Sequence, residues 1–324
     1  MNVSIIAGGA GFVGSNLLPL LAREDRHLIV LDNLCRGREE YIDASRASAG
    51  SRVQFINVEL SDTAATYQAF DAALKVGIVD EVWHLAANSD IPAGVLNAKV
   101  DLRDTFMTTF SLLQAMKVYR IPVLHFASSS AIYGDLGGVP LHEAIGPLLP
   151  ISNYGAMKLA SEALISAAAE SYLSRVNLFR FPNVVGAPAT HGVILDFISK
   201  LKLNCTRLDV LGDGTQQKSY LHVSDLVEAM MHIRDMLNLP KVFPVNIGPF
   251  DEGVTVRFIA ESVIERISPN ARVYFGTGNK GWVGDVPKFQ YSVERLRAAG
   301  WTPKRNSALA VRQAIDEIAR QKGF

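Results

Sequence analysis

Short apolar runs alternate with longer amphipathic segments through the first half of the chain. The hydrophobicity of each short run is continuous rather than alternating, as expected of strands that are buried on both faces of a parallel sheet. The longer segments repeat their apolar positions with a helical period. The predicted strands cover residues 3–7, 28–31, 53–58, 82–85, 123–127 and 176–181, and the predicted helices cover 12–23, 63–74, 101–119 and 153–172. This order predicts an α/β fold with a Rossmann-type doubly wound parallel sheet.

The pattern loosens after about residue 183, where glycines separate shorter elements. We predict that residues 1–182 form a domain built on the sheet, to which segments at about 215–250 return. Residues 183–324 are predicted to form mainly a smaller, discontinuous C-terminal α/β lobe, because no Pro/Ser-rich or charged spacer sets them apart as an independent domain. The helical segments of this part are 224–237, 255–267 and 308–321.

Composition narrows the classes of protein. Of the 324 residues, 48% are hydrophobic and 20% charged, which argues against a disordered chain. The 32 basic and 32 acidic side chains give a net charge of zero, and this balance argues against nucleic acid as a partner. The only cysteines, Cys35 and Cys205, form neither a disulfide framework nor a zinc motif. No apolar run approaches the ~20 residues of a membrane span, and no signal peptide is evident, so we expect a cytoplasmic protein.

A glycine-rich turn joins the first predicted strand to the first predicted helix. Gly8, Gly11 and Gly14 permit a tight turn and let backbone N–H groups approach a pyrophosphate, which the helix N-terminus also attracts. Asp32 ends the second strand eighteen residues after Gly14, where an acid can bind both ribose hydroxyls and would repel a 2′-phosphate. These features predict an NAD-binding domain. Arg36 and Arg38 keep NADP open, and a purely structural turn with a surface aspartate is the alternative.

A second constellation consists of a serine run, a tyrosine and a lysine. Tyr154 and Lys158 are spaced i, i+4 in a predicted helix, which puts both side chains on one face. The phenol has an ordinary pKa of about 10, and a lysine cation together with an oxidised nicotinamide ring would lower that pKa. Residues 128–130 follow the fifth strand, at the sheet edge where doubly wound folds bind ligands. A solvated Tyr/Lys pair is the alternative, which the joint presence of the glycine turn and serine run disfavours.

Taken together, these motifs resemble the extended short-chain dehydrogenase/reductases, the NAD-dependent nucleotide-sugar epimerases and dehydratases. Within that family the chain looks most like microbial UDP-glucose 4-epimerases. The resemblance covers nearly the whole chain and implies the fold predicted above, with a substrate lobe in the C-terminal part. Its motifs are Gly8/Gly11/Gly14, 32–34, 84–87, 128–134, Tyr154/Lys158, 180–186, 190–193, 212–216, 220–225 and 246–248.

The resemblance also implies roles for individual residues. The catalytic group is Ser129, Tyr154 and Lys158, with Ser130 as a weaker candidate for the hydroxyl. The implied cofactor-binding residues are Gly8, Gly11, Phe12, Val13, Gly14, Asp32, Asn33, Glu59, Leu60, Leu85, Ala86, Ala87, Tyr154, Lys158 and Phe181. The implied substrate-binding residues are Ser129, Ser130, Asn183, Gly192, Val193, Lys218 and Trp282.

The implied reaction is epimerisation at C4 of a nucleotide sugar. The sugar is oxidised transiently to a 4-keto form, the hydride passes to NAD⁺ and returns to the opposite face, and no metal is required. Related dehydratases carry an Asp-Glu pair after the catalytic hydroxyl, whereas this chain has Ser130 and Ala131 there. A reductase, dehydratase or other epimerase acting on a GDP-, CDP- or dTDP-sugar is the alternative. The most distant alternative is a non-catalytic NAD(H)-binding regulator.

Several positions depart from the family pattern or lie outside it. Lys218 stands where epimerases usually have a bidentate Arg, and Trp282 stands two residues before Gly284, where a second phosphate-binding Arg is often found. We expect His84 and His222 to be core residues, and we read the 101–104 group as a solvated helix face. In the family, helices corresponding to 105–119 and 153–169 form a dimer interface, so we expect a homodimer, although packing within one chain also explains their composition.

Overall fold

The computed structural model describes residues 1–279, 286, 288 and 291–324, and it divides into two compact units. The first unit comprises Met1–Ile132, Ser152–Arg180 and Met231–Val245. The second comprises Tyr133–Ile151, Phe181–Met230 and Asn246–Phe324. The domain boundary predicted near residue 183 stays a prediction. None of the helices within these described ranges has the length and apolar character needed to cross a bilayer.

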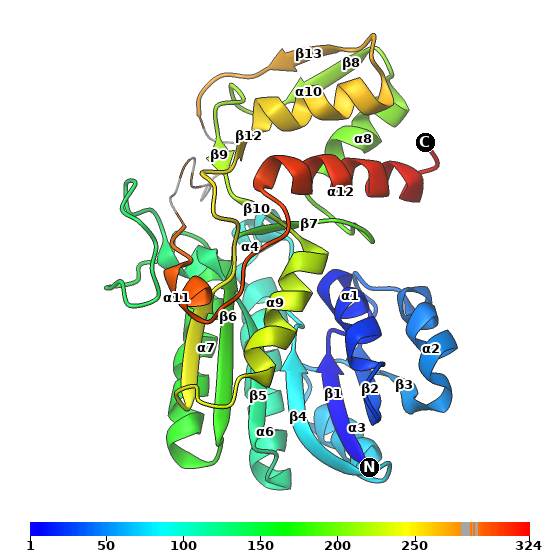
Figure 1. Ribbon diagram of the computed structural model, residues 1–324, viewed down its shortest axis with the longest axis vertical. Coiled ribbons are helices and arrows are strands. Elements are labelled where there is room, and N and C mark those ends of the chain that lie inside the picture. Colours follow the sequence, from blue (N-terminus) through cyan, green and yellow to red (C-terminus); the bar gives the residue numbers. More distant parts are fainter. Residues whose placement is uncertain (280–285, 287, 289–290) are drawn as a thin grey trace. The chain divides into compact units, whose positions relative to one another are not determined.

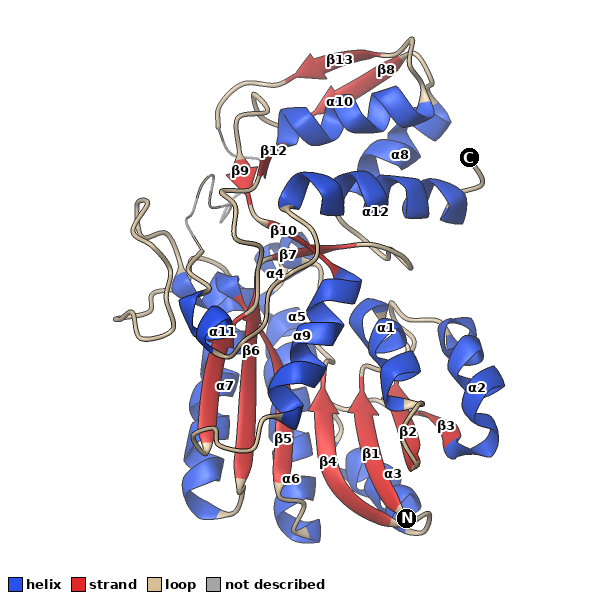
Figure 2. Cartoon of the chain, viewed as in Figure 1, coloured by secondary structure: helices blue, strands red, loops and turns tan. Residues whose placement is uncertain are grey.

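The first unit is built on a seven-stranded sheet with the order β11-β6-β5-β4-β1-β2-β3 (Figures 1 and 2). Strands β1 to β5 pair in parallel in this sheet. The predicted doubly wound α/β fold is therefore confirmed. The strands are β1 (Asn2–Ala7), β2 (Arg26–Asp32), β3 (Val53–Asn57), β4 (Ile78–His84), β5 (Val123–Ser129), β6 (Arg175–Phe181) and β11 (Val242–Asn246).

Helices cover both faces of this sheet, as the continuous apolar runs require. Residues of α3, α6 and α7 share one buried cluster with Val3, Ile5 and Ala7 of β1. Helix α1 lies on the other face of the sheet (Figure 2). The helices are α1 (Phe12–Leu21), α2 (Asp43–Ala49), α3 (Thr63–Leu74), α4 (Ile91–Leu96), α5 (Ala98–Asp101), α6 (Thr108–Tyr119) and α7 (Asn153–Ser171).

One helix differs from its prediction. The segment predicted as a single helix over 101–119 consists of the short α5, a π-helical stretch over Leu102–Met107, and α6. A π-helical stretch changes the rotation of the side chains around the helix axis. The helical period therefore does not tell which way the residues before α6 face.

The described part of the second unit contains a helical core and three two-stranded sheets. Helices α8, α10 and α12 bury an apolar cluster that includes Phe197, Ile259 and Ile315. The helices are α8 (Val193–Leu203), α10 (Val256–Ile267), α11 (Glu294–Ala298) and α12 (Ser307–Gln321), and α9 (Val223–Asp235) continues from this unit into the first. The sheets pair β7 (Asn183–Val185) with β10 (Tyr220–His222), β9 (Gln217–Lys218) with β12 (Val254–Thr255), and β8 (Arg207–Val210) with β13 (Arg272–Phe275).

Candidate active site

In the turn between β1 and α1, each glycine is required or tolerated for a different physical reason. Gly8 has φ +79°, and a Cβ there would lie 2.6 Å from the backbone nitrogen of Ala86. A Cβ on Gly14 would lie 2.5 Å from the Cα of Gly9, so this glycine permits the helix to pack on the turn. Gly11 has more room, because the nearest atom to its added Cβ is the Gly8 carbonyl oxygen at 3.3 Å.

The N-terminus of α1 fits a dinucleotide pyrophosphate. Gly11 is its N-cap residue, and no side chain accepts a hydrogen bond from its first turn. The backbone N–H groups at Phe12, Val13 and Gly14 belong to this turn, which carries the positive end of the helix dipole. Backbone donors without a bulky side chain at Gly11 are what a diphosphate requires.

Asp32 is held firmly at the end of β2. Its side chain is 8% exposed, Oδ2 accepts from the Ala10 nitrogen at 3.1 Å, and Oδ1 accepts from the Leu34 nitrogen at 2.9 Å. Burial raises the pKa of Asp32, and the backbone hydrogen bonds oppose that shift. The carboxylate thus lies against the glycine turn, where it suits the two hydroxyls of an adenosine ribose.

A further acid is oriented near this position. Glu59 Oε2 accepts from Asn33 Nδ2 at 2.9 Å, while Oε1 accepts from the backbone nitrogen and the hydroxyl of Ser61. Burial would raise the pKa of Glu59, but these hydrogen bonds lower it overall. Leu60 is buried next to it. Leu85 donates its N–H to the Ala7 carbonyl. The backbone of Leu85 and Ala86 packs directly against Gly8, and Ala87 follows in the chain.

Ser129, Tyr154 and Lys158 come together at the end of β5 and the start of α7. Ser152 caps α7 by accepting from the Gly155 nitrogen at 3.1 Å, which fixes the turn that carries Tyr154. The Ser129 hydroxyl is near enough to the Tyr154 phenol to lower its pKa, and it accepts from the Ala131 nitrogen at 3.2 Å. Lys158 Nζ lies 5.9 Å from the Tyr154 ring centroid. The three predicted catalytic side chains therefore form one cluster, with Ser130 adjacent in the chain.

Lys158 is buried to an unusual degree for a lysine. It is 2% exposed, donates to the Ala127 carbonyl at 2.6 Å, and lies 4.7 Å from the centroid of the Phe126 ring. Burial lowers the pKa of Lys158 to about 7, although Glu162 and Asp101 act in the opposite direction. An aromatic face and a carbonyl oxygen are both suited to a cation.

The pKa of Tyr154 differs from the sequence expectation. Burial raises it to about 12, the nearby Ser129 hydroxyl acts to lower it, and the charge of Asp101 acts to raise it. The loss of solvent around the phenol dominates, and the lysine does not contribute the lowering that was expected of it. Ionised tyrosine in this cluster therefore needs a further positive charge.

Two acids near the cluster were missed or misread from the sequence. Glu162 lies one turn beyond Lys158, and it accepts from Arg180 Nε at 3.0 Å and Nη2 at 2.6 Å, and from the Ser128 hydroxyl at 2.5 Å. Its i, i+4 spacing from Lys158 was the available signal. The interpretation of 101–104 as a solvated face is wrong for Asp101, which is 0% exposed because its carboxylate packs against Gly94 of α4.

The remaining predicted site residues lie in the second unit or, for one of them, outside the described residues. Asn183 is exposed on β7, Gly192 and Val193 begin α8, and Lys218 is half-buried on β9. Phe181, at the end of β6, also belongs to the second unit. Trp282 lies outside the described residues. The roles proposed for these residues remain predictions.

The two histidines expected in the core are buried. His84 Nε2 bonds the Thr109 hydroxyl at 2.8 Å, and burial lowers the pKa of His84 well below its ordinary value. His222 bonds Ser224 at 2.8 Å and Glu317 at 3.2 Å. Among the described residues, His, Cys, Asp and Glu side chains form no group of three suited to a metal ion.

A doubly wound sheet, a glycine turn with a fixed acid beside it, and a Ser–Tyr–Lys cluster define the class of nicotinamide-dependent short-chain dehydrogenase/reductase-type proteins. The more specific assignment comes from comparison with known families. Residues 4–248 match the model of the NAD dependent epimerase/dehydratase family. The chain belongs to this family.

Relatives and solved structures agree with that assignment. The chain is 26% identical to a putative UDP-glucose 4-epimerase of Methanocaldococcus jannaschii, covering 96% of this chain and 97% of the relative. A crystal structure of a UDP-galactose 4-epimerase superposes with a TM-score of 0.83 at 32% identity over 99% of both chains. The Thermus thermophilus UDP-glucose 4-epimerase in complex with NAD gives a TM-score of 0.83 at 29% identity over 98% of this chain and 99% of that one.

Proposed function

We propose that the protein catalyses NAD-dependent epimerisation of a nucleotide sugar at C4, of the UDP-glucose/UDP-galactose type. The observation that carries the proposal is the cluster of Ser129, Tyr154 and Lys158, in which the buried Lys158 Nζ lies 5.9 Å from the centroid of the Tyr154 ring and Ser129 lowers the pKa of the phenol. The 4-epimerase relatives named above support this reaction. Ala131 argues against dehydration, because it offers no acid or base at the position where dehydratases use one.

In the proposed mechanism, Tyr154 takes the proton of the sugar 4-hydroxyl as the C4 hydride leaves. Bound NAD⁺ supplies the hydride acceptor and a positive ring charge. Ser129 holds the reacting oxygen beside the phenol, and Lys158 orients the nicotinamide ribose and favours the phenolate. After the flat 4-keto sugar has turned over, Tyr154 returns its proton while the hydride returns to the other face, so no proton or electron is gained overall.

The pKa values of Tyr154 and Lys158 indicate that the phenolate would form mainly after the oxidised cofactor binds. With the pKa of Tyr154 at about 12 and that of Lys158 at about 7, burial disfavours the charged form of both side chains. A cationic ring near the phenol shifts the balance toward the phenolate, because opposite charges stabilise each other strongly in a buried site. The site would thus become basic only when oxidised cofactor is present.

The experiment that tests the function is a panel of UDP-, GDP-, CDP- and dTDP-sugars. Each sugar is incubated with the purified protein while NMR follows the configuration at C4 and absorbance follows reduction of NAD. Tyr154→Phe should nearly abolish turnover while leaving NAD bound, whereas Tyr119→Phe, which removes an exposed phenol bonded to Asp71, should leave turnover unchanged. If no sugar with a free 4-hydroxyl is converted or reduces NAD, the proposed function is wrong.

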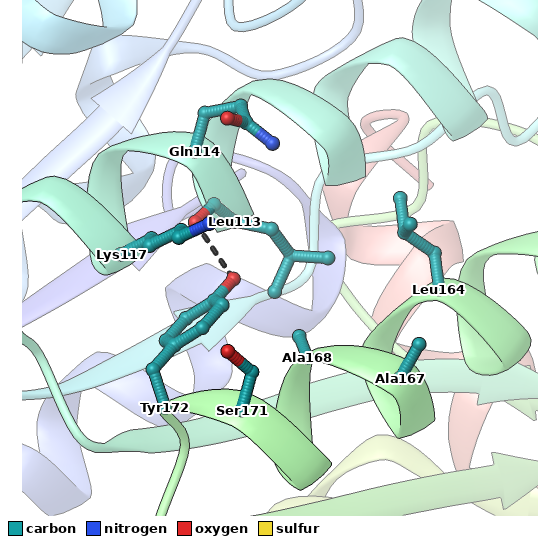
Figure 3. A pocket seen from close by; sticks show the side chains of 8 residues that line it. All are labelled: Leu113, Gln114, Lys117, Leu164, Ala167, Ala168, Ser171 and Tyr172. Carbon is teal, nitrogen blue, oxygen red and sulfur yellow. Dashed lines mark hydrogen bonds between the residues drawn. The ribbon is translucent and has the colours of Figure 1, made fainter.

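We also propose that two copies of the chain pair through α6 and α7. A separate proposal, which the cysteines support, is that the protein acts in the cytoplasm. A pocket of about 200 Å³ opens between these helices (Figure 3), lined by Leu113, Gln114, Lys117, Leu164, Ala167, Ala168, Ser171 and Tyr172. Small residues on α7 permit close approach of another helix. The exposed free cysteines suit a reducing compartment. Sedimentation velocity should give a dimer that Leu164→Arg converts to a monomer, and a monomeric wild type would contradict the pairing.

A further inference from the structure

Asp101 is a buried acid close to the candidate active site. It ends α5, is 0% exposed, and its Oδ1 accepts from Asn88 Nδ2 at 2.8 Å. Its Oδ2 is also buried and has no hydrogen-bond partner among the described residues. A carboxylate oxygen without a partner in such surroundings is costly for stability, so its retention calls for a functional reason.

The free oxygen of Asp101 lies against the backbone of α4, to which the residue before Tyr154 is hydrogen-bonded. A Cβ on Gly94 of α4 would lie 1.8 Å from Asp101 Oδ2, so only glycine allows this approach. The Gly94 carbonyl in turn accepts from Asn153 Nδ2 at 2.9 Å. Asn153 is the first residue of α7 and directly precedes Tyr154. Asp101 therefore packs against Gly94, and the Gly94 carbonyl holds Asn153 at the start of α7, the helix that carries the proposed base Tyr154.

Nearby acids other than Asp101 already have cationic partners. Glu162 is bound by both the Nε and Nη2 atoms of Arg180. Asp90 pairs with Arg36 at 2.6 Å, and Asp104 pairs with Arg103. The hydrogen bond to Asp101, by contrast, comes from a neutral amide. Burial raises the pKa of Asp101 while the Asn88 amide and Lys158 oppose that shift, so its charge acts on its surroundings without the arginine partner that the other acids have.

The charge of Asp101 reaches both members of the catalytic pair. It favours the cationic form of Lys158 and disfavours the phenolate form of Tyr154. The other groups that face this pair are Glu162, neutral His84, the Ser129 hydroxyl and the Ala127 carbonyl. Both effects of Asp101 have the same direction, since each keeps a proton on the pair.

We propose that Asp101 is a positioning residue of the epimerisation proposed above, which acts through its buried charge on Lys158 and Tyr154 and through its contact with Gly94, and thereby sets the pH range in which the pair works. This inference rests on the proposed function. Because the two groups titrate as a coupled pair, the pH profile reports two values that belong to the pair. Removing the charge lets both protons leave more readily, so both limbs of the profile should move to lower pH.

The test compares Asp101→Asn with the wild type and with Asp104→Asn. The first change keeps the shape of the side chain and removes the charge, and the second removes a nearby carboxylate that is paired with Arg103 on the same segment. In Asp101→Asn both limbs of the turnover profile should shift down by about half a pH unit or more, roughly a threefold change in each ionisation constant. In Asp104→Asn they should stay in place.

Unchanged limbs with a lower maximum would show that Asp101 has only a structural role, and equal shifts in both variants would show a general field effect. Either result overturns the inference. If Asp101→Asn fails to fold, Asp101→Ser also removes the charge while keeping an oxygen acceptor for Asn88, and it is assessed in the same way.

A second measurement separates this inference from the proposed function. The phenolate of Tyr154 is titrated by ultraviolet absorbance in the NAD⁺ complex, with the Tyr154→Phe protein subtracted to remove the other tyrosines. A lower phenolate pKa in Asp101→Asn supports the inference even if no sugar is turned over. An unchanged value overturns it, whatever the sugar panel shows.

Discussion

Replacing Glu81 by glutamine should destabilise the first unit by about 3 kcal/mol. Glu81 lies in the middle of β4 and is 6% exposed. The change keeps the size of the side chain but removes the negative charge and places an amide among hydrogen-bond donors. Those donors are Ser4 Oγ at 2.6 Å, Trp83 Nε1 at 3.1 Å, Arg26 Nη1 at 3.1 Å, His125 Nε2 at 3.2 Å and Arg234 Nε at 3.3 Å.

The size of this destabilisation depends on which ion pairs the guanidinium groups of Arg26 and Arg234 retain once the Glu81 charge is removed. Breaking a buried ion pair from one side typically costs 3–5 kcal/mol, because an uncompensated charge stays buried. Arg26 still has Asp80, and Arg234 still has Glu24, to which it donates from Nη1 at 2.5 Å and Nη2 at 2.8 Å. The cost should therefore lie near the lower end of that range. At about 2–4 °C per kcal/mol, the midpoint of thermal unfolding should fall by about 6–12 °C.

Thermal and urea unfolding followed by circular dichroism measure this effect. Glu39→Gln is the matched control, because Glu39 pairs with Arg46 on the surface at 2.7 Å and its side chain is 47% exposed. The loss of an exposed pair should cost less than about 1 kcal/mol. If Glu81→Gln is no more destabilising than this control, the cost of desolvating the network equals its gain, and the reasoning is refuted.

The same network makes an acid-stability prediction. Burial would raise the pKa of Glu81, but the interactions with His125, Arg26 and Arg234 hold it far below its ordinary 4.5. A group with a lowered folded-state pKa stabilises above its unfolded pKa, and that stability is lost as the pH falls through the folded pKa. Below about pH 4.5 the wild type should lose stability more steeply than Glu81→Gln, and parallel curves would contradict the assignment. Burial lowers the pKa of His125, which adds acid sensitivity in both proteins.

Three further substitutions test the cofactor site. Gly8→Ala should destabilise the protein by about 2 kcal/mol or more, because it combines a positive φ with a backbone clash at Ala86, whereas Gly11→Ala should cost less than about 1 kcal/mol yet weaken NAD⁺ binding measured by calorimetry. Equal melting temperatures for the two variants would contradict this distinction. Asp32→Ser should shift the ratio of NAD⁺ to NADP⁺ affinity toward NADP⁺ by about tenfold, about 1.4 kcal/mol, and an unchanged ratio would remove Asp32 from cofactor selection.

Most of the sheet could be predicted because its strands are continuous apolar runs. The run at 123–127 lies within β5, and the helical period at 63–74 matches α3. Strand β11 was located only within a broad returning segment, since the sequence Val242–Asn246 is short and contains a proline. The segment 101–119 was misread because a helical period assumes an uninterrupted α-helix, and the π-helical stretch breaks that assumption.

The part of the candidate site that could be predicted is the part encoded locally. The glycine turn, Asp32 and the Tyr154–Lys158 pair depend on spacings within one strand or one helix. Glu162 and Arg180 become partners only when α7 packs beside β6, and nothing local links Asp101 to Asn88. Polar residues inside apolar strands were overlooked for the same reason. Ser4, Glu81, His125 and Asn177 each lie on a different strand, and hydrogen bonds join them only across the folded sheet.

The buried acids of the first unit divide into two groups with different physical roles. Glu81 and Glu162 are saturated by arginines, so their charges are compensated within the fold and serve its stability. Among the described residues, Asp32 and Asp101 have no arginine partner: backbone N–H groups hold Asp32 at the glycine turn, whereas Asp101 acts with the buried cation Lys158 on Tyr154. A chain with zero net charge exerts little long-range attraction on an anionic dinucleotide. Changes in ionisation when the cofactor binds must then come from local charges that are not already neutralised by an ion pair. Asp101 and Lys158, whose charges act near Tyr154, meet that condition.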